Sequence, residues 1–115
     1  MVLRSLNSLA GTFAQSKEIQ MALSAQSTFK FYYDDGHGWL AVKKKYLKEL
    51  GIADKISQYS YQKGLTAYLE EDCDMEVFVK AMMESFDLHL SDFSLVHVRH
   101  DGRSPIRSYS RYSNS

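Results

Sequence analysis

The sequence predicts an α+β domain, with an antiparallel sheet of about four strands and two helices packed on one of its faces. Between residues 28 and 98, apolar residues first alternate, as in half-buried strands, and then recur at helical spacing. Turns rich in Gly separate these segments, and the cycle occurs twice. The predicted order is therefore ββαββα, followed by a trailing strand.

The first hairpin is predicted around the turn DDGHG at residues 34–38. Phe29, Phe31 and Tyr33 share one face of an alternating strand over residues 28–33, and a second strand resumes at Trp39. The intervening residues tolerate a positive φ angle and favour tight turns. Two strands joined in this way form a hairpin.

A short helix is predicted next, with an apolar stripe made of Val42, Tyr46, Leu47 and Leu50. Gly51 is placed to end this helix in the left-handed conformation. Ile52 would then contact Leu47, as in a Schellman motif.

Gly64 marks the turn of a second hairpin. Residues 59–61 and 65–69 alternate on either side of Gln62-Lys63-Gly64, and Gly supplies the left-handed residue that this turn needs. We therefore predict a positive φ angle at Gly64.

A second helix is predicted from Asp74 to Ser85, directly after the acidic run at residues 70–74. Asp72 or Asp74 is expected to cap it, because carboxylates are favourable at the positive end of a helix. The alternative is a divalent cation site, completed by Asp34, Asp35 or His37 from the first hairpin loop. EF-hand spacing is absent, so no metal or cofactor is assigned.

The chain is expected to contain three parts. Residues 1–27 form an N-terminal extension, weakly amphipathic and dispensable before Met21. Residues 28–98 form the α+β domain, with a net charge of −4 and a last strand over residues 93–98. Residues 99–115 form a basic segment rich in Ser, Arg and Tyr, with a net charge of +3. Within it, residues 105–112 form either an edge strand or a tail that orders only when bound.

Length and cysteine content favour a single cytoplasmic domain. A chain of 115 residues is long enough to bury about two-thirds of its unfolded surface. The single cysteine, Cys73, cannot form an internal disulfide, and neither a secretory signal nor a membrane-spanning apolar run is present. Cys73 also lacks a His at a spacing that marks a catalytic partner.

Two groups of residues are predicted to bind macromolecules. Trp39 with Tyr32 would form an exposed aromatic surface, and Lys43, Lys44 and Lys45 place cations at a helix N-terminus, against the macrodipole. These five are the predicted partner-binding residues. Packing of Trp39 in the core and a solvated lysine face are the alternatives.

The basic segment is the second candidate interface. Arg103, Arg107 and Arg111 interleave with Tyr109 and Tyr112, a composition typical of single-strand binding, in which guanidinium groups pair with phosphates and rings stack on bases. The other interpretation is that these arginines pair with the domain's own carboxylates.

The strings FYYDDGHGWL at residues 31–40 and YLEEDCD at residues 68–74, with Tyr59-Ser60-Tyr61 and Gly64, resemble an uncharacterised family of small phage- and plasmid-borne bacterial proteins. The resemblance covers about half of the chain. It implies a bacterial or phage cytoplasmic setting and an accessory role in a mobile genetic element. No catalytic residue follows from it.

The leading functional prediction is a non-enzymatic accessory protein that binds a protein partner. The negative charge of the domain would repel phosphates, and its aromatic side chains are of the kind that dominate protein interfaces. The alternative is a nucleic-acid-binding protein that uses Arg103, Arg107, Tyr109 and Arg111. A second alternative is a metal-dependent enzyme built on the acidic segments. The oligomeric state is left open.

Overall fold

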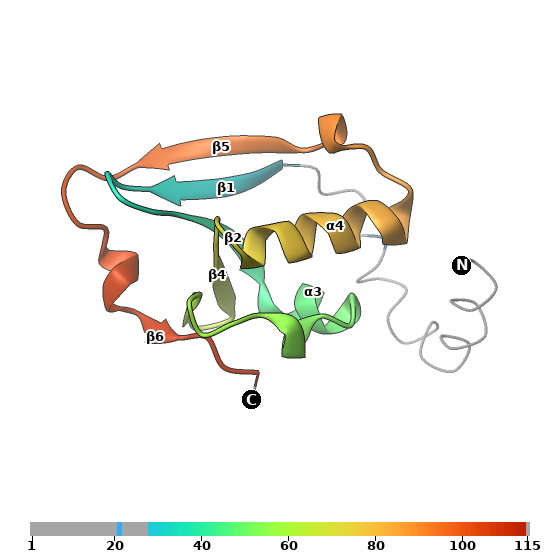
Figure 1. Ribbon diagram of the computed structural model, residues 1–115, viewed down its shortest axis with the longest axis horizontal. Helices are drawn as coiled ribbons and strands as arrows, with labels where there is room; N and C mark the ends of the chain where they lie inside the picture. Colours follow the sequence, from blue (N-terminus) through green and yellow to red (C-terminus); the bar gives the residue numbers. More distant parts are fainter. Residues whose placement is uncertain (1–20, 22–27, 115) are drawn as a thin grey trace.

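The computed structural model describes residue 21 and residues 28–114, which form an α+β fold (Figure 1). Its strands are β1 (Thr28–Tyr33), β2 (Gly38–Lys43), β3 (Tyr61–Lys63), β4 (Thr66–Glu70), β5 (Ser94–Arg99) and β6 (Ser110–Arg111). Its helices are α3 (Lys44–Glu49) and α4 (Asp74–Phe86), with 3-10 turns η1 (Ala53–Lys55), η2 (Leu90–Asp92) and η3 (Pro105–Ser108). The predictions for residues 1–20 lie outside the described residues.

The strands form one six-stranded sheet in the order β5-β1-β2-β4-β3-β6. The prediction of about four antiparallel strands is therefore wrong in number, and it is wrong in direction at β5, which pairs parallel to β1. All other neighbours are antiparallel. The parallel pair follows from the crossover, since β4 runs in the direction of β1, α4 returns the chain, and β5 must then run as β1 does.

Both predicted hairpins are confirmed. In the first, Phe31 pairs with Leu40 across β1 and β2. In the second, β3 and β4 pair up to Lys63 and Thr66, and Gly64 in the turn has a φ angle of 60°. The period-two alternation and the turn residues were enough to predict both hairpins. The strand predicted at residues 59–61 lies instead at Tyr61–Lys63, so Gln62 and Lys63 belong to β3 and not to the turn.

The end of α3 is also as predicted. Gly51 has a φ angle of 73°, and its N–H donates to the carbonyl of Lys48. The N–H of Ile52 donates to the carbonyl of Leu47. This pair of hydrogen bonds defines the Schellman motif.

The core lies between one face of the sheet and the two helices, which cover that face in Figure 1. Strands β1, β2 and β4 supply alternate residues, and α3 and α4 supply one stripe each. The ring of Phe29 meets that of Phe78 edge-on, with centroids 5.4 Å apart. The buried members from these strands and helices are Phe29, Phe31, Leu40, Val42, Ala67, Leu69, Tyr46, Leu47, Phe78 and Met82.

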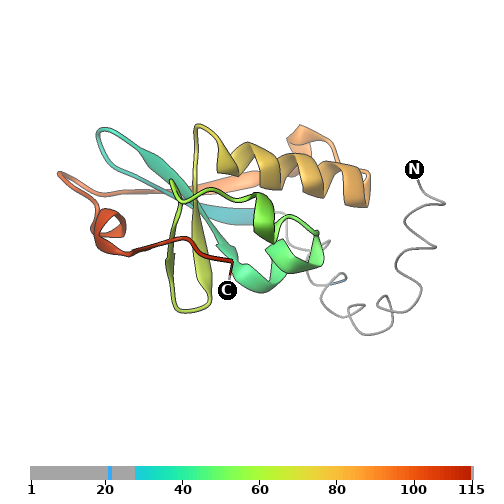
Figure 2. The ribbon, with the colours of Figure 1, turned by 60° about the horizontal axis from the view of Figure 1, so that its bottom comes forward.

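After β5, the C-terminal segment passes through η3 and then joins the sheet as β6 (Figure 2). The edge strand predicted for residues 105–112 is present only at Ser110–Arg111, where β6 pairs with β3, and residues 105–108 instead form the 3-10 turn η3. Ile106 is 3% exposed, and the ring of Tyr109 lies 5.3 Å from that of Tyr68. Residues 99–114 are thus an integral part of the fold.

The N-terminus of α4 differs from the prediction. The N-cap residue is Cys73, and no side chain caps the helix, so the expected capping by Asp72 or Asp74 is wrong. Asp74 is buried in the first turn and accepts hydrogen bonds from the hydroxyl groups of Ser57 and Ser60. These hydroxyl groups and the backbone N–H of Ser57 supply the donors that the buried carboxylate needs.

Gly64 offers a direct test of the second hairpin. A Cβ atom at this position would have nothing within 4 Å, so the cost of a side chain comes from the backbone alone. Gly64→Val should lower the free energy of unfolding by about 1–2 kcal/mol, because an L-residue is strained at positive φ. Gly64→Asn should lose clearly less, because Asn tolerates this region. Chemical denaturation measures both, and equal losses for the two variants would contradict the turn.

Candidate functional site

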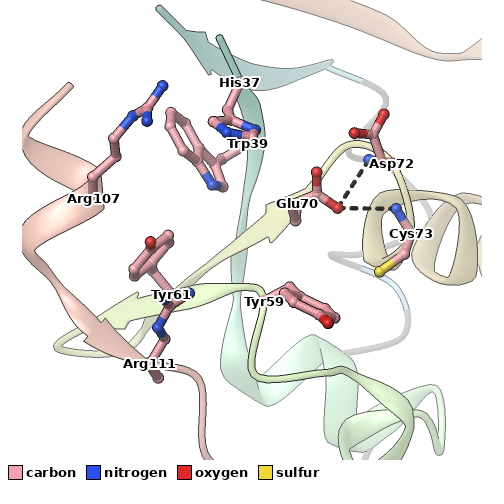
Figure 3. Close-up of a pocket in the computed structure, with 9 residues that line it drawn as sticks. All are labelled: His37, Trp39, Tyr59, Tyr61, Glu70, Asp72, Cys73, Arg107 and Arg111. Carbon is pink, nitrogen blue, oxygen red and sulfur yellow. Dashed lines mark hydrogen bonds between the residues drawn. The ribbon is translucent and has the colours of Figure 1, made fainter. Parts of the chain in front are cut away.

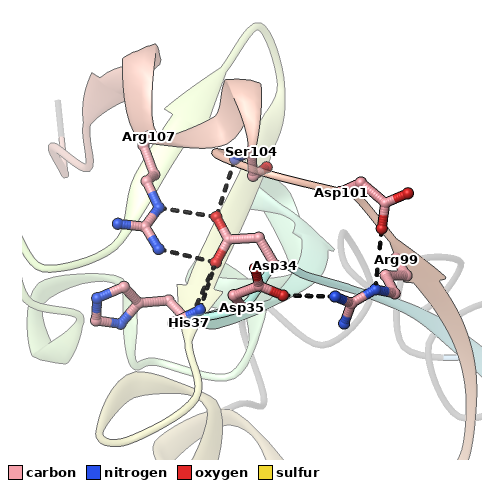
Figure 4. A network of polar contacts seen from close by, with 8 residues as sticks. Asp34, Asp35, His37, Arg99, Asp101, Ser104 and Arg107 are labelled. Atoms are coloured by element: carbon pink, nitrogen blue, oxygen red, sulfur yellow. Dashed lines mark hydrogen bonds and ion pairs between the residues drawn. The ribbon is translucent and has the colours of Figure 1, made fainter.

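A buried ion pair joins the first hairpin loop to the C-terminal segment. The side chain of Asp34 is 1% exposed, and its carboxylate accepts hydrogen bonds of 2.8 Å from both Nε and Nη2 of Arg107. The backbone N–H groups of Ser104, Gly36 and His37 also donate to it (Figure 4). The Arg107 bond is the main cause that holds the pKa of Asp34 well below its ordinary value, against burial, which raises it.

Arg107 also covers the single tryptophan. Its Cζ lies 5.8 Å from the ring centroid of Trp39. Trp39 follows Gly38 and precedes the core residue Leu40, so it points away from the helices, and it is 2% exposed. Tyr61 of β3 meets it edge-on, with centroids 6.2 Å apart. Arg111 of β6 in turn lies over Tyr61, 4.7 Å from its centroid.

These groups surround a pocket of about 430 Å³, which we call the aromatic pocket. Its volume lies within the range of ligand sites. Tyr59, at 68% exposed, is its most open aromatic side chain. The full lining is His37, Trp39, Tyr59, Tyr61, Glu70, Asp72, Cys73, Arg107 and Arg111.

The two sides of the aromatic pocket carry opposite charges (Figure 3). The arginines stand on the side of the C-terminal segment, and Glu70 and Asp72 stand on the side of the turn before α4. Glu70 fixes that turn, because its Oε1 accepts from the backbone N–H groups of Asp72 and Cys73 at 3.0 and 3.1 Å. A bound group would therefore meet guanidinium, aromatic and carboxylate surfaces in succession.

Trp39 and Tyr32, predicted as an exposed aromatic surface, face each other across β1 and β2. Trp39 is buried, so the alternative that it packs inside the protein holds and the prediction of an exposed Trp39 is wrong. Its ring nevertheless lines the aromatic pocket. Tyr32 is half-buried against Tyr68, with centroids 5.9 Å apart. It lines a second, smaller pocket of about 220 Å³ that Tyr109 also borders.

The predicted lysines lie outside the aromatic pocket. Lys43 ends β2, and Lys44 and Lys45 begin α3. Lys44 Nζ donates to Gln62 Oε1 on β3 at 2.9 Å, which accounts for a cation at this helix start. Lys43 and Lys45 lie 5.9 and 5.8 Å from the centroid of Tyr46.

The basic segment does bring three of its four predicted residues to one face of the sheet. Arg107 lies over Trp39, Arg111 over Tyr61, and Tyr109 contacts Tyr68. Arg103 is exposed in the loop before η3 and lines neither pocket. The interpretation that these arginines pair with the domain's own carboxylates holds for Arg107.

Sequence reasoning missed the convergence of Tyr59, Tyr61, Glu70 and Asp72 with the two arginines. The alternation of β2 gave one indication of this site. Trp39 is next to the core residue Leu40, so its side chain is expected on the other face of the sheet. The placement of the C-terminal segment over that face gave no sequence signal, since Asp34 and Arg107 are far apart along the chain.

Cys73 and His37 both line the aromatic pocket. Partial burial is the main cause that raises the pKa of the Cys73 thiol, and the charges of Asp74 and Glu70 raise it further, against the hydrogen bond with Ser57, which lowers it. A nucleophilic cysteine needs the opposite shift. Within residues 28–114, no three side chains of His, Cys, Asp or Glu come together in a way that could hold a metal ion.

No helix in the described part of the chain is long and apolar enough to cross a bilayer. Comparisons of the sequence and the structure with protein-family models, curated proteins and solved structures give no match.

The Asp34–Arg107 ion pair predicts a specific pH dependence. Arg107→Met should lower the free energy of unfolding by about 3 kcal/mol at neutral pH, because it leaves a buried carboxylate without its cation. The pKa of Asp34 is lower in the folded protein than in the unfolded chain, where it is near 4. The ionised carboxylate therefore stabilises the fold above about pH 4, and this contribution is lost as the pH falls below that value. The difference between parent and variant should therefore shrink below about pH 4.

Arg103→Met is the matched control. It removes the same charge from the same segment but touches neither Asp34 nor either pocket, so it should change stability by less than about 0.5 kcal/mol. Urea denaturation at several pH values measures all three proteins. A loss for Arg107→Met that is equal at neutral and acid pH would contradict the role of the Asp34 carboxylate.

Proposed function

We propose that this chain is a non-enzymatic protein that binds a protein partner, and that the aromatic pocket anchors a segment of that partner. The observation that carries this proposal is the pairing of opposite charges across an aromatic floor. Side chains of Trp, Tyr and Arg in a partly enclosed pocket are those that most often dominate the energy of protein association. A partner segment is also the ligand class that commonly carries apolar, acidic and basic groups within a few residues.

The charge balance favours a polypeptide over a nucleic acid. The charge of Arg107 is matched by the buried Asp34 carboxylate, and that of Arg99 by Asp35 and Asp101. Arg111 is the guanidinium of the pocket without a carboxylate partner among the described residues. A phosphate chain that followed the pocket would pass from Arg111 to the carboxylates opposite, where like charges repel.

The proposed occupant is a short segment with an apolar or aromatic side chain between an acidic and a basic residue. The acidic residue would pair with the exposed Arg111, and the basic residue with Asp72 on the opposite side. The central side chain would contact Tyr59 and Tyr61. The accessory role in a mobile element, which the family resemblance implies, belongs to the same proposal.

Nucleic-acid binding is the second candidate, and one observation favours it. Arg111 stacks over Tyr61, and Lys63 Nζ lies 4.9 Å from the centroid of Tyr109, so cations and rings alternate along one face. Such platforms hold single strands. Binding that weakens steeply with salt would identify this mode.

Selection from a random peptide library, followed by titration calorimetry of the selected peptides, tests the proposal. We expect peptides of the stated pattern, and we expect Tyr59→Ala and Arg111→Ala each to weaken them about tenfold or more, as for residues that dominate an interface. Leu90→Ala removes an exposed apolar side chain from η2, outside the pocket. It should leave affinity unchanged.

Two results would contradict the proposal. One is the selection of peptides whose affinity is unaffected by both pocket variants. The other is that no peptide is selected, while mixed single-stranded oligonucleotides bind at low salt and Arg111→Ala weakens that binding. This result would establish nucleic-acid binding instead.

A further inference from the structure

Strand β5 is a sheet edge that carries no charged residue before its last position, Arg99. It ends the sheet order on one side, and within residues 28–114 no strand pairs with its outer side (Figure 1). From Ser94 to Val98 it carries neither a charged residue nor a proline, and Val96 is 48% exposed. Natural proteins usually block such edges with charges, prolines or bulges. The opposite edge, β6, has only two residues.

The outward backbone groups of β5 can be assigned from one hydrogen bond. The N–H of His100 donates to the carbonyl of Tyr33 at the end of β1, so residue 100 directs its backbone toward β1. Alternate residues of a strand direct their N–H and C=O groups to opposite sides. Val96 therefore bonds to β1, whereas Leu95 and His97 direct their backbone groups outward.

This edge is complementary to itself in an antiparallel register centred on Val96. In that register the two Val96 side chains meet at a twofold axis as a non-hydrogen-bonded pair. Leu95 of one copy faces His97 of the other, and both have outward N–H and C=O groups to exchange. Residues that pair directly across two strands have their side chains on the same side of the sheet. The two Val96 side chains would therefore meet on the side opposite the helices, and Leu95 would lie on the helix side.

The ends of the strand favour the same antiparallel arrangement. β5 begins at Ser94 and ends at Arg99, its one charged residue. In the register centred on Val96, the uncharged residues 94–98 of the two copies face one another, and Arg99 of each copy faces Phe93 of the other. The two Arg99 side chains, each paired with Asp35 and Asp101 of its own copy, therefore stay apart, whereas a parallel pairing would bring them together.

We propose that two copies of this chain associate through antiparallel pairing of their β5 strands about Val96, which extends the sheet from one copy into the other. A strand pair buries less surface than a typical stable interface, so the dimer should form reversibly with rising concentration. This surface is separate from the aromatic pocket, because β5 and the pocket strands β3 and β4 lie on opposite sides of β1 and β2 in the sheet. The partner-binding proposal neither requires nor excludes it.

Sedimentation equilibrium of the full chain over about a hundredfold concentration range tests the proposal, since association follows mass action. The parent should shift from monomer to dimer. Val96→Glu should remain monomeric, because two carboxylates would meet at the twofold axis. The fold of each copy should tolerate the new carboxylate, because it faces Lys30 of β1. Val96→Thr, which keeps the β-branched shape without charge, should still dimerise.

Amide hydrogen exchange of the parent gives a second test that needs no variant. The N–H groups of Leu95 and His97 should become more protected as concentration rises, while that of Val96 should be protected throughout by β1. Three results would overturn the proposal. The first is a parent that stays monomeric, with rapid exchange at Leu95 and His97. The second is protection of both N–H groups that does not depend on concentration, which would assign the edge to a segment of the same chain. The third is dimerisation that survives Val96→Glu.

Discussion

The second face of this sheet depends on one buried carboxylate. Asp34 would be costly to bury as an isolated charge, and five donor groups from the hairpin loop and the C-terminal segment surround it. Bidentate pairing restricts the direction and distance at which a guanidinium can approach a carboxylate. Arg107 is thereby held over Trp39, and the rest of the C-terminal segment follows from that placement.

The aromatic pocket is a consequence of this arrangement. After η3, which is held against the hairpin loop, the chain continues along β3 as β6 and brings Arg111 over Tyr61. The opposite wall is fixed independently, because Glu70 holds the turn that presents Asp72. The proposed binding of a charged and aromatic peptide thus uses two walls, each held by its own hydrogen bonds. Preorganised walls lower the entropy cost of binding.

The sequence was sufficient for local structure and insufficient for the pairing of distant segments. The alternation in β1, β2 and β4, the Gly51 cap and the Gly64 turn depend on neighbours in the chain and appear as predicted, whereas β3 spans Tyr61–Lys63 instead of residues 59–61. The parallel placement of β5 and the folding of residues 103–112 over Trp39 depend on contacts such as Asp34 with Arg107, between residues separated by 73 positions. An Asp in a Gly-rich loop is typical of a turn, and the second role of Asp34, as an acceptor for a distant Arg, leaves no local pattern in the sequence.

A double-mutant cycle on Asp34→Ala and Arg107→Ala tests the central claim most directly, with unfolding followed by the fluorescence of Trp39, the only tryptophan. The account predicts that the two losses in unfolding free energy are strongly non-additive, with a coupling of about 2 kcal/mol or more, as for groups in one hydrogen-bonded network. It also predicts that each single variant exposes Trp39 to a soluble quencher in the folded state. Additive losses within about 0.5 kcal/mol, with Trp39 still shielded in both variants, would show that the second face forms without this ion pair.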